Sequence, residues 1–242
     1  MEKKVALVTG ASRGIGRRIA AEFASSGFSV ALNYKENSEA AKTALGEIER
    51  SGGSGALFKC DVTDHGAVIE MIEAIIARFG KIDVLVNNAG ITKNRGILKM
   101  TKEEWDSVIN TDLNGPFYVL KECARHMASA KNGSIINISS ITAYRGVLGA
   151  SNYAAAKAGL TALTKSAAME FGRHNIRVNA VLPGFHNTDM GQKASKVYVE
   201  KALQDSVLSL TTDISELSSF VLFLSGMKTV SGQVFSWDSR II

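Results

Sequence analysis

The stretch Val5-Ala-Leu-Val-Thr-Gly-Ala-Ser-Arg-Gly-Ile-Gly16 decides the fold. Its apolar start is typical of a strand buried on both faces, and the segment 15–25 that follows has the spacing of a helix. The glycines between them let the backbone approach a pyrophosphate, and the start of a helix offers free N–H groups to an anion. The stretch therefore predicts a dinucleotide-binding turn. Its glycine spacing differs from G-x-G-x-x-G, so a flexible strand-to-helix turn without a ligand is the alternative.

The alternation of strand and helix continues along the whole chain. Short apolar runs rich in β-branched residues predict strands, and longer segments with helical spacing separate them. The predicted strands are 5–8, 29–32, 56–58, 82–86, 134–138, 176–182 and 233–237, and the predicted helices are 15–25, 38–50, 65–79, 102–128, 150–173 and 214–224. This pattern indicates an α/β protein with a Rossmann-type doubly wound parallel sheet of about seven strands and helices on both faces. Only two prolines occur and no linker divides the chain, so we expect a single domain over 1–242.

The composition excludes several classes of protein. With 242 residues, of which 45% are hydrophobic and 21% charged, the chain is not intrinsically disordered. No apolar run approaches the roughly 18 to 20 residues that cross a bilayer, and the first residues lack a signal-peptide pattern, so we expect no membrane contact and a cytoplasmic location. Cys60 and Cys123 lack the spacing of metal ligands, which predicts buried reduced thiols and no metal.

The charge distribution restricts the partners. A net charge of +5 comes from 28 basic and 23 acidic residues that are scattered along the chain. Scattered charge does not favour nucleic-acid binding. A mildly positive balance suits an anionic partner, such as a phosphorylated cofactor or an acidic carrier protein.

Further motifs follow the predicted strands. Asn87-Asn-Ala-Gly90 closes the fourth strand, Ser140 follows the fifth, and Tyr153 and Lys157 lie at the start of the next helix. At these motifs the sequence resembles the short-chain dehydrogenase/reductase family, and the resemblance covers nearly the whole chain. It rests on TGxxxGxG at 9–16, Asp61-Val62, NNAG at 87–90, Ser139-Ser140, YxxxK at 153–157, and the segment from Asn179 through Pro183-Gly184 to Thr188. Within the family, the segments 91–93 and 103–105 are most similar to the β-ketoacyl-(acyl carrier protein) reductases.

Tyr153 and Lys157 are the candidate catalytic pair. They are one helical turn apart, so both side chains project from the same face of the predicted helix. An adjacent ammonium favours the phenolate form of a tyrosine, which makes proton exchange feasible. The resemblance implies that Tyr153 is the general acid/base, that Lys157 assists it and binds the nicotinamide ribose, and that Ser140 orients the carbonyl. An isolated YxxxK would indicate a solvated helix face, but Ser140 and the glycine turn favour the catalytic interpretation.

The resemblance also implies a set of cofactor contacts. Asp61 would bind the adenine amino group and Val62 would pack on the ring, although Asp61 could also cap the helix that begins near Thr63. Thr188 would contact the nicotinamide carboxamide, or it is an exposed loop residue. A short substrate-binding loop is expected near 186–212. The complete set of expected cofactor contacts is Gly10, Ser12, Arg13, Gly14, Ile15, Gly16, Asn33, Lys35, Asp61, Val62, Asn88, Ala89, Gly90, Tyr153, Lys157, Pro183, Gly184 and Thr188.

The end of the second strand predicts which cofactor is used. Relatives that are specific for NAD place an acid there to bind the ribose diol, whereas this chain has Asn33-Tyr34-Lys35. Arg13 lies within the glycine turn, so a 2′-phosphate would meet cations. We therefore expect NADPH/NADP, although Arg13 and Lys35 could also be solvated surface charges.

The chain departs from the family pattern in two places. The family has an asparagine as the fourth member of its catalytic tetrad, and here the position holds Asp112, whose carboxylate accepts hydrogen bonds but cannot donate through an amide. We expect Asp112 to take part in catalysis as an acceptor in the proton relay. The C-terminal segment 232–242 and the preceding segment 207–211 also lack the landmarks of the reductases of fatty-acid synthesis. The C-terminal segment often forms subunit contacts in the family.

These observations lead to one favoured function and two alternatives. The favoured function is an NADPH-dependent carbonyl reductase, equivalently an alcohol dehydrogenase in reverse, which acts on a 3-oxoacyl thioester such as 3-oxoacyl-acyl carrier protein. The alternatives are a dehydrogenase of a cyclic, sugar or xenobiotic alcohol, and a non-catalytic nucleotide-binding subunit. The resemblance implies a homotetramer or homodimer built on the helices at 102–128 and 150–173. Ala158, Ala162 and Ala168 would permit close approach of the copies, or they pack on the sheet. Lys131 and Arg173 would form a basic patch for acyl carrier protein beside the active-site mouth, or they are solvated cations near the C-termini of helices.

Overall fold

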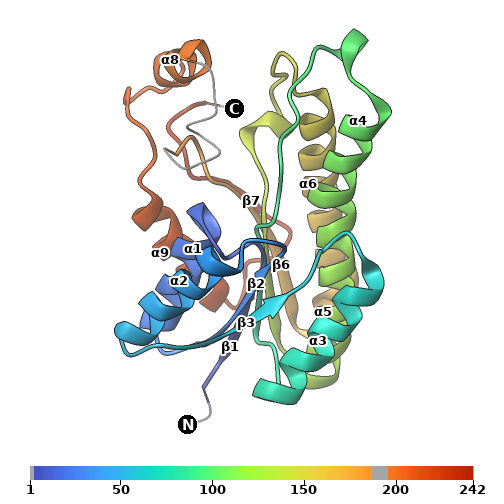
Figure 1. Cartoon of the computed structure of the whole chain (residues 1–242), viewed down its shortest axis with the longest axis vertical. Helices are drawn as coiled ribbons and strands as arrows, with labels where there is room; N and C mark the ends of the chain where they lie inside the picture. Colours follow the sequence, from blue (N-terminus) through green and yellow to red (C-terminus); the bar gives the residue numbers. More distant parts are fainter. Residues whose placement is uncertain (1–2, 187–195, 242) are drawn as a thin grey trace.

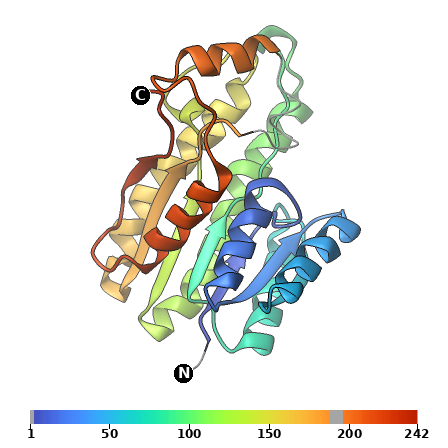
Figure 2. The same cartoon turned by 90° about the vertical axis from the view of Figure 1, so that its left-hand side faces the viewer.

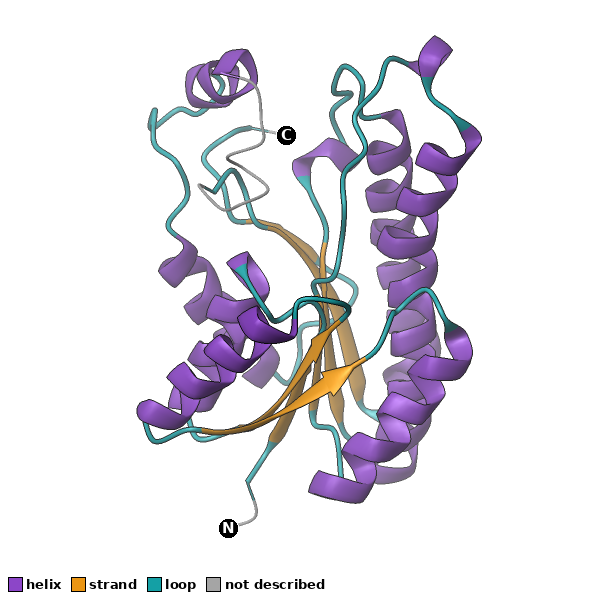
Figure 3. Cartoon of the chain, in the orientation of Figure 1, coloured by secondary structure: helices purple, strands orange, loops and turns teal. Residues whose placement is uncertain are grey.

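A seven-stranded parallel sheet forms the centre of the computed structural model, which describes residues 3–186 and 196–241 (Figures 1 and 3). The strands lie in the order β3-β2-β1-β4-β5-β6-β7. They are β1 (Val5–Val8), β2 (Ser29–Tyr34), β3 (Ser54–Lys59), β4 (Val84–Asn87), β5 (Gly133–Ile138), β6 (Ile176–Leu182) and β7 (Val234–Ser236). The helices are α1 (Gly14–Ser25), α2 (Ser38–Arg50), α3 (His65–Phe79), α4 (Lys102–Ile109), α5 (Gly115–Ala130), α6 (Ser151–Phe171), α8 (Lys196–Gln204) and α9 (Ile214–Gly226).

Helices cover both faces of the sheet, as Figures 1 and 2 show. Helices α1, α2 and α9 lie on one face, and α3, α4, α5 and α6 lie on the other. Successive residues of β1 point to opposite faces, so Val5 and Leu7 belong to the core under α3, α5 and α6, while Ala6 and Val8 belong to the core under α1 and α9. The fully apolar strand is thus explained by burial on both sides, and the predicted doubly wound α/β fold is confirmed.

The edge of the sheet at which the strands end is where a ligand-binding site is expected. The chain leaves β1 in one direction to form β2 and β3, and it continues on the other side of β1 from β4 to β7. Such a reversal opens a crevice at the carboxyl ends of the strands, because the connections on the two sides diverge. The loops after β1, β4, β5 and β6 all meet at this edge, which is the upper end of the sheet in Figure 1.

Several elements differ from the sequence-based prediction, most by one to three residues at their ends. The helix predicted over 102–128 contains a π-helical turn, η2 (Asn110–Asn114), between α4 and α5. Helix α8 forms within the segment predicted as a loop near 186–212, of which 187–195 lie outside the described residues. Strand β4 begins at Val84 instead of residue 82, because the Asp83 carboxylate accepts a hydrogen bond from the Val5 amide at 2.8 Å. Short 3-10 turns also form: η1 (Ile97–Lys99), η3 (Ile141–Ala143) and η4 (Gly172–His174).

The predictions about burial and about membrane spans can be compared with this structure. Cys60 and Cys123 are buried and free, as predicted. Burial raises the pKa of Cys60 to about 11, so its thiol is protonated near neutral pH. None of the described helices has both the length and the apolar surface to cross a membrane.

Candidate active site

The glycine turn after β1 has the conformation that a pyrophosphate site requires. Gly10 and Gly14 adopt positive φ angles of 63° and 55°, which side chains other than glycine rarely adopt. Arg13 is the N-cap of α1 and makes no side-chain cap, whereas α2, α3, α4 and α9 are each capped by an Asn, Asp or Thr side chain. The first N–H groups of α1 therefore have no side-chain acceptor. Ser12 and Ile15 are partly exposed beside them, and this arrangement fits the diphosphate of a dinucleotide.

The loop after β4 interlocks with this turn. Thr9 Oγ1 accepts hydrogen bonds from the backbone amides of Asn88 and Ala89, both at 3.0 Å. Asn88 Nδ2 donates in return to the carbonyl oxygens of Thr9 and Gly10. A Cβ atom at Gly16 would collide with this amide and with Gly10 O, so residue 16 must be glycine. The Nδ2 group of Asn88 thus supports the glycine turn.

Asn33 lies beneath the turn instead of beside it. Its side chain is 2% exposed, its Oδ1 accepts from Gly10 N, and its Nδ2 donates to Phe58 O and Cys60 O. All of its polar atoms are thus engaged with the backbone. The geometry assigns Asn33 to holding the glycine turn in place, which differs from the expected direct cofactor contact.

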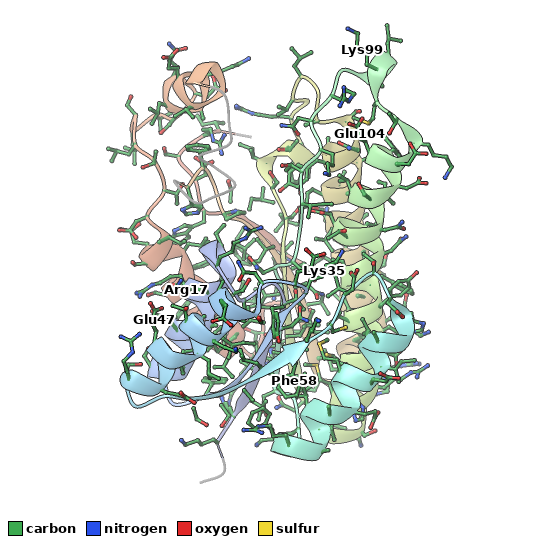
Figure 4. The ribbon with its side chains drawn as sticks, viewed as in Figure 1. Arg17, Lys35, Glu47, Phe58, Lys99 and Glu104 are labelled. Atoms are coloured by element: carbon green, nitrogen blue, oxygen red, sulfur yellow. The ribbon has the colours of Figure 1, made fainter. Side chains whose placement is uncertain are left out.

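Lys35 and Asp61 form an ion pair at the ends of β2 and β3, with 2.9 Å between Lys35 Nζ and Asp61 Oδ2. Partial burial disfavours the Asp61 carboxylate, but hydrogen bonds from Thr63 and the charge of Lys35 lower its pKa below the ordinary value. Asp61 Oδ1 accepts a hydrogen bond from the Thr63 amide at 3.0 Å. The residue that caps α3 is Asp64, so the alternative that Asp61 caps this helix is wrong. In Figure 4, Lys35 lies near the middle of the molecule, at the carboxyl edge above Phe58.

Other predicted adenine and ribose contacts lie close to this pair. Val62 is 6% exposed, and a Cβ atom at Gly115 would come within 2.8 Å of its side chain, so α5 begins against Val62. Arg13 is exposed at the start of α1. The structure thus places the adenine and phosphate candidates along one edge, from the glycine turn to the end of β3.

Ser140, Tyr153 and Lys157 meet where β5 ends against α6. Lys157 Nζ donates to Ile138 O at 3.1 Å, and Ser139 Oγ donates to Lys157 O at 3.1 Å, so the strand and the helix are joined on both sides of the lysine. Lys157 Nζ lies 5.5 Å from the centre of the Tyr153 ring. Tyr153 and Ser140 are partly exposed, whereas Lys157 is 3% exposed. Ser140 Oγ accepts from the Thr142 amide at 3.2 Å and shares a hydrogen bond with Thr142 Oγ1 at 2.9 Å, so this hydroxyl caps η3. The ammonium of Lys157 is thus more deeply buried than either hydroxyl-bearing residue.

Asp112 is completely buried in the π-helical turn η2 and faces Lys157. Its Oδ2 lies 3.1 Å from Lys157 Nζ, and its Oδ1 accepts from the Ile91 amide at 2.8 Å. Burial raises the pKa of Asp112, and the Lys157 charge and the Ile91 hydrogen bond oppose this rise. Burial also disfavours the charged form of Lys157, but attraction to Asp112 outweighs it and raises the pKa of Lys157. A Cβ atom at Gly90 would lie 2.7 Å from Asp112 Oδ2, which explains the glycine that ends NNAG.

The loop after β6 carries the remaining predicted contacts. Pro183 is buried, and Gly184 adopts a φ of 79° with no room for a Cβ atom beside Thr212 Oγ1 and Trp237 O. Thr188 lies outside the described residues. His186, for which no role was predicted, is 5% exposed and bonds to Pro183 O through Nε2 at 2.5 Å. Burial lowers the pKa of His186, so its ring is neutral near pH 7.

The unusual C-terminal segment packs on its own chain. Arg240 bridges to Ser206 in antiparallel fashion, and Val207 N donates to Ser239 O at 3.2 Å. Arg145, from the loop after β5, bonds to Ile241 O and pairs with Asp205 at 3.2 Å. The end of the chain therefore connects the segment after α8 with the loop that follows Ser140.

The basic pair Lys131 and Arg173 is not beside the active-site mouth of its own chain, so the expected placement is wrong. Both residues precede their strands, because β5 begins at Gly133 and β6 begins at Ile176, whereas Ser140 follows the end of β5. In a parallel sheet the starts and the ends of the strands lie at opposite edges. Asn175 Nδ2 donates to Lys131 O, which keeps the two helix ends together at the far edge.

Sequence reasoning missed two residues that position the site. Thr9 clamps the NNAG loop, and its place in TGxxxGxG could have indicated this role. Asn152 is fully buried, and its Nδ2 joins Lys93 O to Glu104 O, both at 3.1 Å, directly before Tyr153. Only its position next to Tyr153 could have drawn attention to it. Among residues 3–186 and 196–241, no three His, Cys, Asp or Glu side chains form a group suited to a metal ion.

Comparisons with known proteins agree with this geometry. A short chain dehydrogenase family model matches residues 4–198. The chain is 41% identical to a 3-oxoacyl-(acyl-carrier-protein) reductase of Staphylococcus aureus over 232 residues, which cover 95% of this chain and 94% of the relative. It is 39% identical to the corresponding reductase of Thermotoga maritima, with 100% and 99% covered.

Solved structures show the same similarity. A putative short-chain alcohol dehydrogenase of Sinorhizobium meliloti superposes with a TM-score of 0.93 at 32% identity, covering 99% of this chain and 96% of that one. A crystal structure of an actinorhodin polyketide ketoreductase with NADPH superposes with a TM-score of 0.91 at 30% identity, covering 97% and 95%.

Proposed function

Since the chain belongs to the short-chain dehydrogenase family, we propose that it is an NADPH-dependent reductase that converts the 3-oxo group of an acyl thioester into a 3-hydroxyl group. The observation that carries this proposal is the cluster at the end of β5, where Lys157 Nζ lies 5.5 Å from the Tyr153 ring and Ser140 opens the adjoining loop. The choice of an acyl thioester is supported by the names of the relatives at 41% and 39% identity, which are reductases of 3-oxoacyl-(acyl-carrier-protein).

The chain's own residues divide the work of carbonyl reduction. Ser140 Oγ donates a hydrogen bond to the substrate oxygen and so orients the carbonyl group. The Tyr153 hydroxyl donates its proton to the same oxygen as negative charge develops there. Lys157 stabilises the phenolate that remains, from a buried position where its charge is weakly screened. When bound, the nicotinamide cofactor supplies the hydride for this reduction.

The preference for NADPH is supported by the end of β2. Asn33, Tyr34 and Lys35 end this strand and its turn without an acid, and Lys35 is held at the carboxyl edge by Asp61 at 2.9 Å and by Glu36 at 3.8 Å. A 2′-phosphate at this edge gains a charge-assisted contact with Lys35. The ketoreductase at 30% identity was crystallised with NADPH, which agrees with this choice.

An acyl carrier protein is the proposed source of the thioester. The names of the relatives support this partner, and so does the net charge of +5. Carrier docking through surface charge mainly accelerates encounter and weakens as salt is added. Within one chain, Lys131 and Arg173 cannot provide this docking, because they lie at the opposite edge of the sheet.

A cyclic or polyketide ketone is the second candidate substrate. The superposition on a polyketide ketoreductase with a TM-score of 0.91 favours it. The segments 207–211 and 232–242 lack the landmarks of the reductases of fatty-acid synthesis, and Arg145, in the loop that follows Ser140, contacts Asp205 and Ile241 beside them. Both candidate reactions use the same Tyr153 chemistry, so only substrates distinguish them.

The decisive experiment measures NADPH oxidation with a matched panel of ketones. The panel contains one 3-oxoacyl group on acyl carrier protein, the same group on coenzyme A and on a pantetheine mimic, and several cyclic ketones. We expect the highest kcat/KM with the carrier-linked thioester, with an advantage that falls as the salt concentration rises.

The other outcomes of this panel are equally informative. The highest kcat/KM with a cyclic ketone would replace the thioester by the second candidate. Equal rates with carrier and coenzyme A at low salt would remove the carrier from the proposal. Cofactor binding without turnover of any ketone would indicate a nucleotide-binding subunit.

A further inference from the structure

Asp112 stands where the family has an asparagine, and its surroundings suit a carboxylate. The side chain is 0% exposed in the π-helical turn η2. One oxygen accepts from the Ile91 amide at 2.8 Å, and the other lies 3.1 Å from Lys157 Nζ. No polar group of the described residues meets hydrogen-bond geometry with Oδ2, so the ion pair with Lys157 provides its compensation. The charge of a buried carboxylate is thus balanced by a single ammonium.

An amide in this position would face a donor on either side. If its oxygen kept the Ile91 hydrogen bond, its NH2 group would point at the Lys157 ammonium, which can only donate. If the amide were turned over, the NH2 group would meet the Ile91 N–H instead. Residue 90 must be small for Asp112 and Lys157 to approach each other here, because a Cβ atom at Gly90 would lie 2.7 Å from Asp112 Oδ2. The local geometry is therefore built for a direct ion pair.

Lys157 has few other charges around it. The groups that act on its ammonium are Asp112 from η2 and Tyr153 from its own helix, and β5 presents the neutral carbonyl of Ile138. Charged groups on the other elements packed against α6 have partners elsewhere: Glu104 of α4 pairs with Arg95, Lys102 of α4 with Asp106, Glu122 of α5 with His65, and Arg177 of β6 bonds to the carbonyl of Asn175. Arg173 and His174 of η4 bond to each other beyond the far end of α6. Asp112 is thus the anion that decides how much positive charge Tyr153 experiences.

We propose that Asp112 is a positioning residue that holds the Lys157 ammonium by a direct ion pair and partly neutralises it, so that proton transfer at Tyr153 shifts to higher pH. This inference rests on the proposed role of Tyr153 as the acid. An isolated ammonium favours the phenolate, whereas an ion pair acts as a dipole and favours it less. Tyr153 then keeps its proton to higher pH, which extends carbonyl reduction into alkaline conditions and delays alcohol oxidation.

The test is a titration of Tyr153 that needs no substrate. Tyrosinate absorbance is followed against pH for the wild-type protein and for Asp112→Asn, and each curve is corrected with the matching Tyr153→Phe protein to isolate residue 153. We expect the Tyr153 midpoint to fall by about one pH unit in Asp112→Asn, because one charge near the phenol is removed. An unchanged or higher midpoint would overturn the inference.

Two further variants make the test specific. Glu122→Gln removes a different buried carboxylate, from helix α5, which follows η2 directly. Glu122 pairs with His65 and with Arg125, each at 2.8 Å. This variant should leave the Tyr153 titration midpoint unchanged. Asp112→Ser keeps a small acceptor for the Ile91 amide and serves if Asp112→Asn does not fold. The same downward shift is expected with serine, and its absence in the folded protein would also contradict the proposal.

Kinetics then separate this inference from the proposed function. With a ketone that is turned over, the alkaline limb of kcat/KM for reduction should move down in Asp112→Asn by the same amount as the titration midpoint. The maximal rate should change much less than the position of the limb. If no ketone in the panel reacts but the midpoint shifts, the proposed function is wrong while the electrostatic role of Asp112 stands. If ketones react and the midpoint is unchanged, the function stands and the role of Asp112 falls.

Discussion

Tyr153 and Lys157 share one face of α6, but their environments differ. The phenol is partly exposed toward the crevice, whereas the ammonium is buried behind it and held between Ile138 O and Asp112. Asn152 fixes the start of the helix to the loop after β4 and to α4. This division gives the substrate a hydroxyl group to meet and keeps the charge that supports it in a medium where it is weakly screened.

The proposed preference for NADPH also rests on a single residue, Lys35. Lys35→Ala should raise KM for NADPH about tenfold and leave KM for NADH nearly unchanged, because it removes a charge-assisted contact with the 2′-phosphate. Steady-state kinetics with both cofactors measure this. Lys42→Ala, which removes a cation paired with Glu39 on α2, is the control. A parallel loss with NADH, or no loss with NADPH, would contradict the assignment of Lys35.

At the scale of elements, the glycine turn and the NNAG loop behave as one unit. Thr9 and Asn88 exchange hydrogen bonds across the gap between β1 and β4, and Gly16 brings α1 against Asn88. An ion pair between Arg17 and Glu47 also joins α1 to α2 (Figure 4). A change within this unit should therefore affect cofactor binding before it affects the remainder of the fold.

Gly16→Ala tests this unit. The new methyl group would collide with Asn88 Nδ2 and Gly10 O, so we expect cofactor affinity to fall at least about tenfold and stability to fall by about 1 to 3 kcal/mol. Gly46→Ala is the matched control, because Gly46 lies within α2 and a Cβ atom there meets nothing within 4 Å. That change should stabilise the protein by about 0.5 to 1 kcal/mol. Fluorescence titration with NADPH and thermal unfolding measure both, and equal behaviour of the two variants would argue against the interlock.

The elements show which features a sequence can predict. Strand β1 was predictable because a fully apolar run buried on both faces leaves a direct trace in the sequence. The π-helical turn at Asp112 leaves no such trace in the sequence, because it depends on how the consecutive helices α4, η2 and α5 pack against Gly90 and Lys157. Residue type indicated that Asp112 is an acceptor, but its choice of Lys157 as partner depends on packing. Asn33 shows the same limit, because its position after β2 does not reveal that its side chain turns under the glycine loop.

At the scale of the whole molecule, helices α5 and α6 expose apolar and small side chains that a second copy could cover. Met169 is 87% exposed and Phe117 is 43% exposed, and Ala158 and Ala162 lie exposed on α6. Ala168 packs against the core of its own chain, which is the alternative expected for these alanines. Small residues on an exposed helix permit close approach of a symmetric partner. We therefore retain a homotetramer or homodimer as the expected assembly.

Ala162→Arg tests the assembly. A long cation at this exposed position would separate two closely packed helices, so we expect the sedimentation coefficient to fall at micromolar concentration while the circular dichroism spectrum stays unchanged. Thr43→Arg, which adds the same side chain to exposed α2 on the other face of the sheet, should leave sedimentation unaltered. A wild-type protein that sediments as a monomer would contradict the expected assembly.

Tyr153→Phe tests the central claim most directly, because it removes only the hydroxyl group that donates the proton. Tyr118→Phe removes the same group from a tyrosine that stacks on His65 outside the candidate site, and it is the matched control. With a ketone that the wild-type protein reduces, we predict that Tyr153→Phe binds NADPH with nearly wild-type affinity and lowers kcat by about a hundredfold or more. Turnover by Tyr153→Phe at the rate of Tyr118→Phe would contradict the proposed mechanism.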